Sequence, residues 1–276
     1  MPVHVDTLAL ERPRSLKAAL SMLAGDPSLT PIAGCTDVYV SFQFGTMKQQ
    51  RFIDLWPLDE LRGIAVHGET LRVGALTTYT ELIESKQVAR RLPMLVAASR
   101  EVGGAQIQNR GTLGGNIANA SPAGDTLPVL AAANARVVLR NDRGQRTVPF
   151  ESFYTGYRAS IRQPNELITA IEFPAIRGRQ WWRKVGTRRA QAISKIMIAA
   201  VRGAKGGEVR IAFGSVAPTV VLASKAASIL RNGGSIAAAQ QALLTEITPI
   251  DDIRSTREYR ASVAANLLAE FWNSTT

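Results

Sequence analysis

The first 55 residues carry one helical apolar pattern and two short strand-like runs. Apolar residues recur at helical spacing within residues 15–25, and Gly25 ends the pattern. This spacing predicts a helix. The apolar runs at 29–34 and 51–55 predict strands, the first of which leads into a turn.

The chain then passes from strand periodicity to helical periodicity. Two alternating runs within 63–76 flank a Gly-Glu pair at 68–69, which predicts a hairpin turn. Helical periodicity follows across 77–103. Thr77 or Thr78 is placed to cap the first turn of that helix.

The rest of the chain mixes short helices with hairpin strands. We expect a helix around 127–134 and a hairpin at 136–150 that turns at Asn141–Gly144. A second unit begins near Arg177, with predicted strands at 181–186 and 208–216 and predicted helices at 235–247 and 255–273. This irregular alternation favours an α+β fold over a doubly wound sheet.

No part of the sequence predicts a membrane span or a secretory signal. The two most apolar stretches are short and contain Arg136 and Lys195. The N-terminus has acidic residues and no apolar h-region. We therefore expect a cytoplasmic protein.

The supply of metal ligands is small. The chain has 1 cysteine, Cys35, and 2 histidines. One cysteine cannot form an intramolecular disulfide or hold an iron–sulfur cluster, and these residues disfavour a zinc site. We expect no metal site in this chain, so any redox metal would lie on a partner.

The net charge is strongly positive. The sequence has 33 basic and 22 acidic residues, a formal net charge of +11, which invites a nucleic-acid or anion interpretation. The charges are dispersed, however, and no convincing RNA-binding signature accompanies them. We expect no nucleic acid, because an anionic ligand or an acidic partner subunit explains the charge as well.

Two glycine-bearing loops carry the candidate chemistry, "PIAGCTD" at 31–37 and "NRGTLGGNIANASPAGD" at 109–125. Glycine lets backbone amides approach an anion closely, and a helix N-terminus after the first loop would add further donors. Neither loop fits a P-loop or a Rossmann fingerprint. Composition alone leaves both ligand binding and structural turns open, and Asp125 could accept from ligand hydroxyls or cap the following helix.

Five motifs in order give the sequence a family resemblance. They are "PIAGCTDVYV", "NRGTLGGNIANASPAGDTLPVL", "FYTGYRASIRQPNELITAIEFP", "KVGTRRAQAISKI" and "ITPIDDIRSTREYRASVAANLL". Together they resemble the FAD-binding medium subunit of molybdenum hydroxylases, the family of xanthine dehydrogenase and carbon monoxide dehydrogenase flavoproteins. The "GGNIANASPAGD" motif resembles the sequences of the xanthine dehydrogenase branch more closely than those of the carbon monoxide dehydrogenase branch.

This resemblance implies a fold and a set of partners. An FAD domain of the vanillyl-alcohol-oxidase (PCMH) type would cover 1–176, with subdomains of about 1–55 and 56–176, and a CO dehydrogenase flavoprotein C-terminal-like domain would cover 177–276. The implied partners are a molybdenum-cofactor large subunit and a small subunit with 2Fe-2S clusters, in a dimer of heterotrimers. Electrons would reach FAD here and leave to NAD⁺ or another acceptor.

The resemblance also assigns residues to the cofactor. The pyrophosphate loop would comprise Ile32, Ala33, Gly34, Cys35, Thr36 and Asp37. Cys35 departs from the usual glycine or asparagine and is tolerable if its φ is not positive; a small buried thiol is the simpler role for its side chain.

The second loop would contact the diphosphate, ribityl and adenosine parts of FAD. The matching residues are Thr112, Gly115, Asn116, Asn119 and Asp125, with backbone contacts from Gly111 and Ala118. Asn116 could instead satisfy its own loop as a turn asparagine.

Four further residues match positions near the flavin or adenine. Leu167 and Ile168 are apolar and could equally be core. Lys184 would stabilise negative charge at the flavin's polar edge, or be a solvated strand lysine. Ile193 stands where the carbon monoxide dehydrogenase branch has an aromatic residue, which again favours the xanthine dehydrogenase branch.

The implied activity is that of an electron-transfer subunit with no catalytic side chain of its own. The remaining alternatives are the flavin subunit of an aldehyde, carbon monoxide or N-heteroaromatic hydroxylase, and a flavin-free scaffold subunit. Arg188 and Arg189 could steer a dinucleotide phosphate or contact the iron–sulfur subunit, but a solvated loop is the simpler interpretation. Asp251 and Asp252 are expected to fix a turn and pair with nearby arginines.

Overall fold

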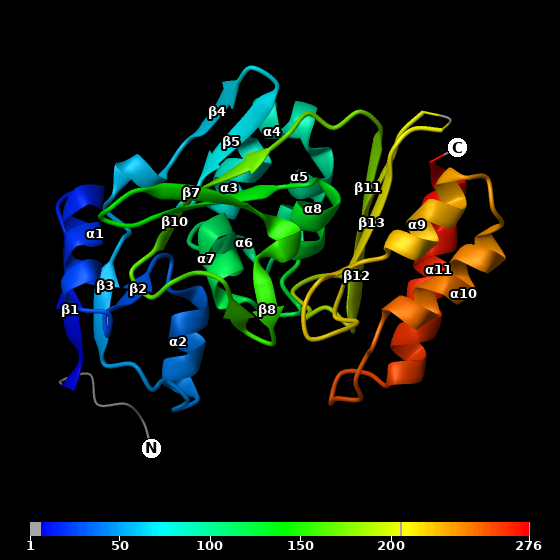
Figure 1. Cartoon of the computed structure of the whole chain (residues 1–276). Coiled ribbons are helices and arrows are strands. Elements are labelled where there is room, and N and C mark those ends of the chain that lie inside the picture. Colours follow the sequence, from blue (N-terminus) through cyan, green and yellow to red (C-terminus); the bar gives the residue numbers. More distant parts are fainter. Residues whose placement is uncertain (1–6, 205, 276) are drawn as a thin grey trace.

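The computed structural model describes residues 7–204 and 206–275. A small parallel sheet, a five-stranded antiparallel sheet and a four-stranded antiparallel sheet follow one another along the molecule (Figure 1). Helices accompany each sheet, so the α+β prediction is confirmed. The N-terminal prediction concerns a segment whose first six residues, including His4, lie outside the described residues.

The first unit has three short parallel strands in the order β1-β3-β2. Its elements are β1 (Ala9–Glu11), α1 (Leu16–Gly25), β2 (Thr30–Ile32), α2 (Thr36–Gln43) and β3 (Arg51–Asp54). The predicted helix and both predicted strands are confirmed. Ser15 caps α1, because its hydroxyl accepts a hydrogen bond of 3.1 Å from the amide of Ala18. The apolar face of α1 packs in a buried cluster that reaches Leu76 and Leu167 of the second unit.

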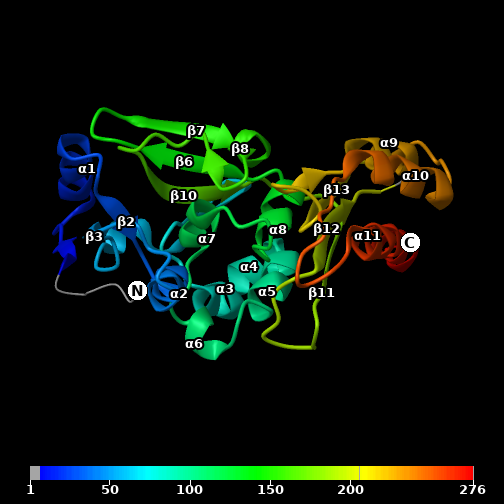
Figure 2. The same cartoon turned by 90° about the horizontal axis from the view of Figure 1, so that it is seen from below.

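The second unit is built on the antiparallel sheet β4-β5-β10-β6-β7. Its strands are β4 (Ile64–His67), β5 (Thr70–Gly74), β6 (Arg136–Arg140), β7 (Gln145–Pro149) and β10 (Leu167–Phe173), beside the small hairpin β8 (Tyr154–Gly156) and β9 (Ala159–Ser160). Its helices are α3 (Tyr79–Glu84), α4 (Lys86–Arg91), α5 (Pro93–Arg100), α6 (Ala105–Gln108), α7 (Leu113–Asn119) and α8 (Leu127–Ala132), with 3₁₀ turns at Asp59–Leu61 and Phe150–Ser152. These helices lie on one side of the sheet (Figure 2).

Both predicted hairpins are confirmed. Gly68, at the turn between β4 and β5, has φ +59°, a conformation that glycine adopts without steric cost. Asn141 organises the second turn, because its side chain accepts hydrogen bonds from the amides of Arg143 and Gly144, both at 2.9 Å.

The helical periodicity predicted over 77–103 and the cap at Thr78 are confirmed, but the segment forms three helices, α3, α4 and α5, rather than one. Thr78 makes a reciprocal capping box with Glu81. Ser85 then ends α3 and caps α4, and Pro93 starts α5 because its ring cannot continue a helix from the preceding turn. The apolar spacing continued across these breaks because all three helices bury a face in the same cluster.

The third unit is the antiparallel sheet β11-β12-β13-β14 covered by three helices. Its elements are β11 (Arg179–Val185), β12 (Ile196–Arg202), β13 (Val209–Gly214), β14 (Val221–Leu222), α9 (Ser224–Arg231), α10 (Ile236–Glu246) and α11 (Arg257–Ser274). The predicted strands and helices are confirmed, but β12, β14 and α9 were not predicted. Six of the seven β12 residues are buried, so this strand shows an unbroken apolar run rather than alternation.

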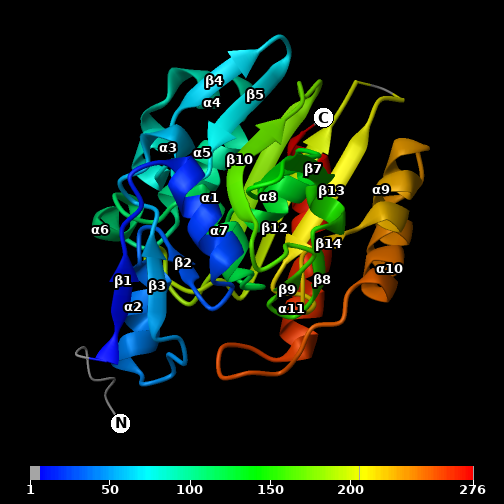
Figure 3. The ribbon, with the colours of Figure 1, turned by 60° about the vertical axis from the view of Figure 1, so that its left-hand side comes forward.

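The third sheet packs between its own helices and the second unit (Figure 3). In β11, Trp182 packs against the core of the second unit, whereas Trp181 and Val185 pack against the core beneath the helices. This alternation is the period of two expected of a strand. It directs even-numbered β11 side chains toward the second unit. No helix among the described residues is long and apolar enough to cross a membrane.

Candidate functional site

A cavity of about 890 Å³ lies where the three units meet. It is lined by both glycine-bearing loops, by the start of β10 and by three loops of the third unit. Sites for cofactors of this size are typically about 300–1,000 Å³. The fold therefore provides one large concave site to which segments distant in sequence contribute.

The first loop crosses from β2 to α2 and meets the second loop at Gly34. A β-carbon at Gly34 would lie 1.6 Å from the carbonyl oxygen of Arg110. No side chain can be accommodated there, so this glycine permits the two loop backbones to touch. The loop then places Thr36 at the N-terminus of α2, where free amides favour an anionic group.

Cys35 has φ +61° and stands at the N-cap of α2 without a side-chain capping bond. A side chain at position 35 was expected to be tolerable only if φ is not positive, and this condition is not met. A left-handed conformation explains the preference for glycine or asparagine at this position. The thiol is partly buried, its Sγ lies 3.4 Å from the carbonyl oxygen of Ala33, and burial raises its pKa.

The second loop is partly helical, which the sequence did not indicate. Thr112 is buried and caps α7, because its hydroxyl accepts a hydrogen bond of 3.1 Å from the amide of Gly115. Gly114 packs against Ala75, where a β-carbon would approach the Ala75 Cβ to 2.6 Å. The glycines thus fit α7 tightly against the end of β5.

Two asparagines of this loop line the cavity and bond to other segments. Asn116 Oδ1 accepts a hydrogen bond of 2.7 Å from the Thr126 hydroxyl, which links α7 to the segment before α8. Asn119 Oδ1 accepts a bond of 2.9 Å from Arg158. Burial raises the pKa of the neighbouring Asp37, while Arg158 and Asn119 oppose this rise.

The Asp125 side chain contacts residues of the third unit and does not cap a helix. Its Oδ2 lies 2.8 Å from Lys184 Nζ, and its Oδ1 accepts a hydrogen bond of 2.5 Å from the Ser194 hydroxyl. Helix α8 has Thr126 at its N-cap and no side-chain capping bond, so the capping alternative for Asp125 is wrong. Burial raises the pKa of Asp125, and Lys184 and Ser194 act against that rise.

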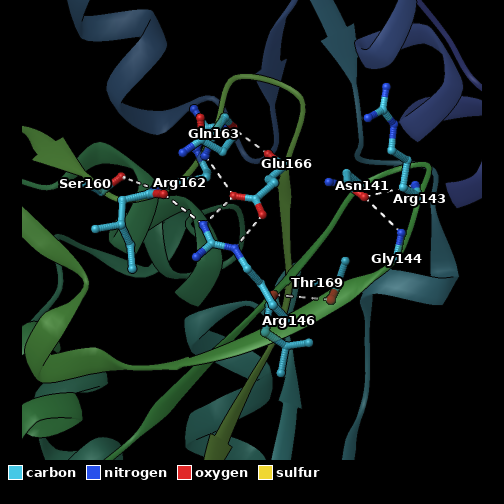
Figure 4. Close-up of polar contacts among 11 residues, drawn as sticks. Asn141, Arg143, Gly144, Arg146, Ser160, Arg162, Gln163, Glu166 and Thr169 are labelled. Carbon is cyan, nitrogen blue, oxygen red and sulfur yellow. Dashed lines mark hydrogen bonds and ion pairs between the residues drawn. The ribbon is translucent and has the colours of Figure 1, made fainter.

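The loop before β10 is held by a buried carboxylate (Figure 4). Glu166 accepts two bonds from Arg146, at 2.7 and 2.8 Å, and one of 2.8 Å from the amide of Gln163. Arg162 donates to the backbone carbonyls of Gln163 and Glu166. This network fixes the start of β10, where Leu167 and Ile168 line the cavity and are themselves buried.

The third unit supplies a wall of the cavity in which the sequence indicated only Ile193. Arg260 is buried and donates to the Ser215 carbonyl at 2.9 Å and to Asp252 at 2.7 Å. Asp252 also contacts Arg254, and Asp251 pairs with Arg257, so the expected arginine pairing of this turn is confirmed. Further lining residues missed from sequence are Gln191, Ala192, Ser194, Ser215, Ala217, Pro218, Thr248 and Ile250.

The residues assigned by resemblance converge on this cavity, with one exception. Those that line it are Ile32, Ala33, Gly34, Cys35, Thr36, Asp37, Gly111, Thr112, Gly115, Asn116, Ala118, Asn119, Asp125, Leu167, Ile168 and Ile193. Lys184 stands behind Asp125, and its side chain is only 6% exposed, so the solvated-lysine alternative is wrong. Arg188 lies in an exposed loop and donates to the backbone carbonyls of Ala190 and Gln191.

The lining suits a dinucleotide better than a metal. It combines glycine-lined backbone, threonine and asparagine side chains, and apolar residues such as Leu167. These groups complement phosphate, hydroxyl and ring surfaces respectively. No cluster of three or more potential metal ligands occurs within residues 7–204 and 206–275.

Sequence profiles place the chain in a known family. The FAD binding domain in molybdopterin dehydrogenase matches residues 6–176, and the CO dehydrogenase flavoprotein C-terminal domain matches residues 181–275. Fold and site thus define an FAD-binding oxidoreductase subunit. The chain belongs to the family of FAD subunits of molybdenum hydroxylases.

Individual relatives agree with this assignment. The chain is 32% identical to a xanthine dehydrogenase FAD-binding subunit of Escherichia coli O157:H7, with 92% of this chain and 91% of the relative covered. It is 30% identical to the carbon monoxide dehydrogenase medium chain of Hydrogenophaga pseudoflava, with 93% and 92% covered. A solved structure of carbon monoxide dehydrogenase from that organism superposes with a TM-score of 0.93 at 28% identity, covering 100% of this chain and 98% of the other.

Proposed function

We propose that this chain is the electron-transfer subunit of a xanthine dehydrogenase-like molybdenum hydroxylase that acts on a purine or another N-heterocycle. The observation that carries the proposal is the convergence of both glycine-bearing loops on one cavity of about 890 Å³. The cavity has the size and the mixed polar and apolar lining of a cofactor site.

The chain's own residues would bind and orient FAD. The amides of the Gly34 loop and the Thr112 loop would hold the pyrophosphate, and Leu167 and Ile168 would pack against a ring. Gly111, Gly115, Asn116, Ala118 and Asn119 would complete the polar wall, and Ile193 would lie at the flavin. When bound, FAD supplies the redox chemistry, accepting electrons from a partner subunit and passing them to NAD⁺ or another acceptor.

We place the other redox centres on partner chains. One cysteine cannot hold an iron–sulfur cluster, so the 2Fe-2S clusters would belong to a small subunit and the molybdenum cofactor to a large one. The name "medium chain" of one relative supports a complex with larger and smaller subunits. We expect a dimer of such heterotrimers.

The substrate class rests on loop residues more than on overall identity. Identities of 32% and 30% to xanthine and carbon monoxide dehydrogenase subunits are too similar to separate the two classes. Ile193 lines the cavity with 58% of its surface exposed. An aliphatic residue here, together with the "GGNIANASPAGD" text, supports the xanthine dehydrogenase branch.

The test is anaerobic reduction of the assembled complex. The chain is co-expressed with its partner subunits, and flavin absorbance is followed after addition of xanthine, an N-heteroaromatic compound, an aldehyde or carbon monoxide. We expect bleaching by xanthine or the N-heterocycle and recovery on addition of NAD⁺. Bleaching by only an aldehyde or carbon monoxide would contradict the proposed substrate class.

A further inference from the structure

The Asp125 carboxylate belongs to the second unit, but both of its oxygens are bound by the third. Lys184 Nζ lies 2.8 Å from Oδ2, and Ser194 Oγ lies 2.5 Å from Oδ1. The Asp125 and Lys184 side chains are 11% and 6% exposed, and Ser194 is 2% exposed. At this burial, charged hydrogen bonds are less weakened by solvent than they are at the surface.

One donor, Lys184, stands on β11, and the other, Ser194, lies in the loop that leads into the neighbouring strand β12. Lys184 lies on the β11 face that packs against the second unit, as does Trp182, whose indole nitrogen lies 3.4 Å from the Asp125 carbonyl oxygen. Ser194 comes just before β12, where the amide of Lys195 bonds the carbonyl of Val185 at 2.9 Å. The sheet therefore positions Lys184 directly, and the Lys195–Val185 hydrogen bond holds the residue next to Ser194 against the end of β11.

Lys184 does not itself line the cavity. Its ammonium group also donates to the backbone carbonyl of Glu101 at 3.0 Å. The lysine is thus directed to Asp125 and to one helix end. Any influence on a ligand in the cavity passes through the Asp125 carboxylate.

The hydrogen-bonding capacity that Asp125 retains defines the ligand group that it can take. An ionised carboxylate has about four lone-pair sites, and the structure uses two of them. Asp125 lines the cavity, so the remaining sites can accept from a ligand. A carboxylate accepts from hydroxyl or N–H groups and repels phosphate.

We infer that Ser194 and Lys184 are positioning residues that hold the Asp125 carboxylate so that it accepts hydrogen bonds from hydroxyl or N–H groups of bound FAD. The third unit thereby completes a site whose phosphate-binding loops belong to the first two units. The inference rests on the proposed function, because it takes FAD as the ligand of the cavity.

The test begins with Ser194→Ala in the full chain. The dissociation constant of FAD is measured by flavin fluorescence with the reconstituted apoprotein. Loss of a hydrogen bond to a charged group should raise this constant about tenfold, and Ser194→Thr, which keeps the hydroxyl, should restore most of the affinity. Ser99→Ala is the matched control, because Ser99 is fully buried, its hydroxyl has no partner, and it does not line the cavity.

A double-mutant cycle separates positioning from a general structural effect. If Ser194 acts through Asp125, Ser194→Ala should change FAD affinity by less than about twofold in an Asp125→Ala background. Thermal unfolding of each variant verifies that it folds. The inference would be overturned if Ser194→Ala bound FAD with wild-type affinity. It would also be overturned if Ser194→Ala weakened FAD binding equally in the wild-type and Asp125→Ala backgrounds. Neither result would contradict the FAD site itself. Failure of the wild-type chain to bind FAD would overturn the proposed function and this inference with it.

Discussion

The α-carbon of Gly34 lies so close to the Arg110 carbonyl that a β-carbon on residue 34 would be 1.6 Å from its oxygen. This contact joins the two loops that line the cavity. It involves backbone on both sides, so no side-chain rearrangement can relieve a clash. The distance between the loops is therefore set by the absence of a side chain at position 34.

Gly34→Ala should separate the loops and damage the site. We expect a loss of about 3 kcal/mol in the free energy of unfolding and loss of FAD binding, measured by chemical denaturation and by flavin content. Gly144→Ala is the control, because a β-carbon there meets nothing within 4 Å. Normal flavin content in a folded Gly34→Ala protein would show that FAD binding does not need the close approach of the two loop backbones.

Cys35→Gly should stabilise the protein. The left-handed backbone at φ +61° costs a non-glycine residue about 1–2 kcal/mol, and the extra unfolded-state entropy of glycine offsets part of this gain. We expect a net increase of about 0.5 kcal/mol in the free energy of unfolding, with FAD binding retained. Cys35→Ala keeps the β-carbon and should show no such gain. A Cys35→Gly protein less stable than Cys35→Ala would contradict this account.

Glu166→Gln should weaken the acid dependence of stability. The bonds from Arg146 hold the pKa of Glu166 below its ordinary value. The carboxylate therefore contributes stability above the unfolded-state pKa of about 4.3, and this contribution is lost as the pH falls through the folded-state pKa. We expect Glu166→Gln to lower the free energy of unfolding by about 2 kcal/mol at pH 7, because hydrogen bonds to a charged group are lost, and by progressively less below about pH 4, measured by denaturation across pH.

Glu69→Gln is the matched control for that experiment. Glu69 pairs with Arg177 at 3.4 Å, but the two side chains are 75% and 85% exposed. Such a surface pair contributes about 0–1 kcal/mol. If Glu166→Gln and Glu69→Gln lowered the free energy of unfolding by the same amount at pH 7, the Glu166 network would be no stronger than a surface ion pair.

The fold was predictable where local patterns were strong. Hairpin turns and the long helices of the third unit follow from glycine, asparagine and apolar spacing. The breaks at Ser85 and Pro93 were missed because three helices share one buried face, which keeps the spacing continuous. Strand β12 was missed because burial on both faces removes the alternation that marks a strand.

The candidate site was predictable to the extent that it lies in motifs. The glycine-bearing loops identified a large part of the cavity wall, but the positive φ of Cys35 cannot be predicted from composition. Lys184 matched a cofactor position yet stands behind Asp125. Ser194, Arg260 and Asp252 reach the cavity through the packing of separate units, which local sequence does not encode.

The most direct test of the account is the flavin content of the purified protein. The visible absorption spectrum is recorded for the chain alone and co-expressed with its partner subunits, and the released cofactor is identified by chromatography. The account predicts FAD at one molecule per chain. A folded protein without flavin in both preparations would contradict it and leave a scaffold role.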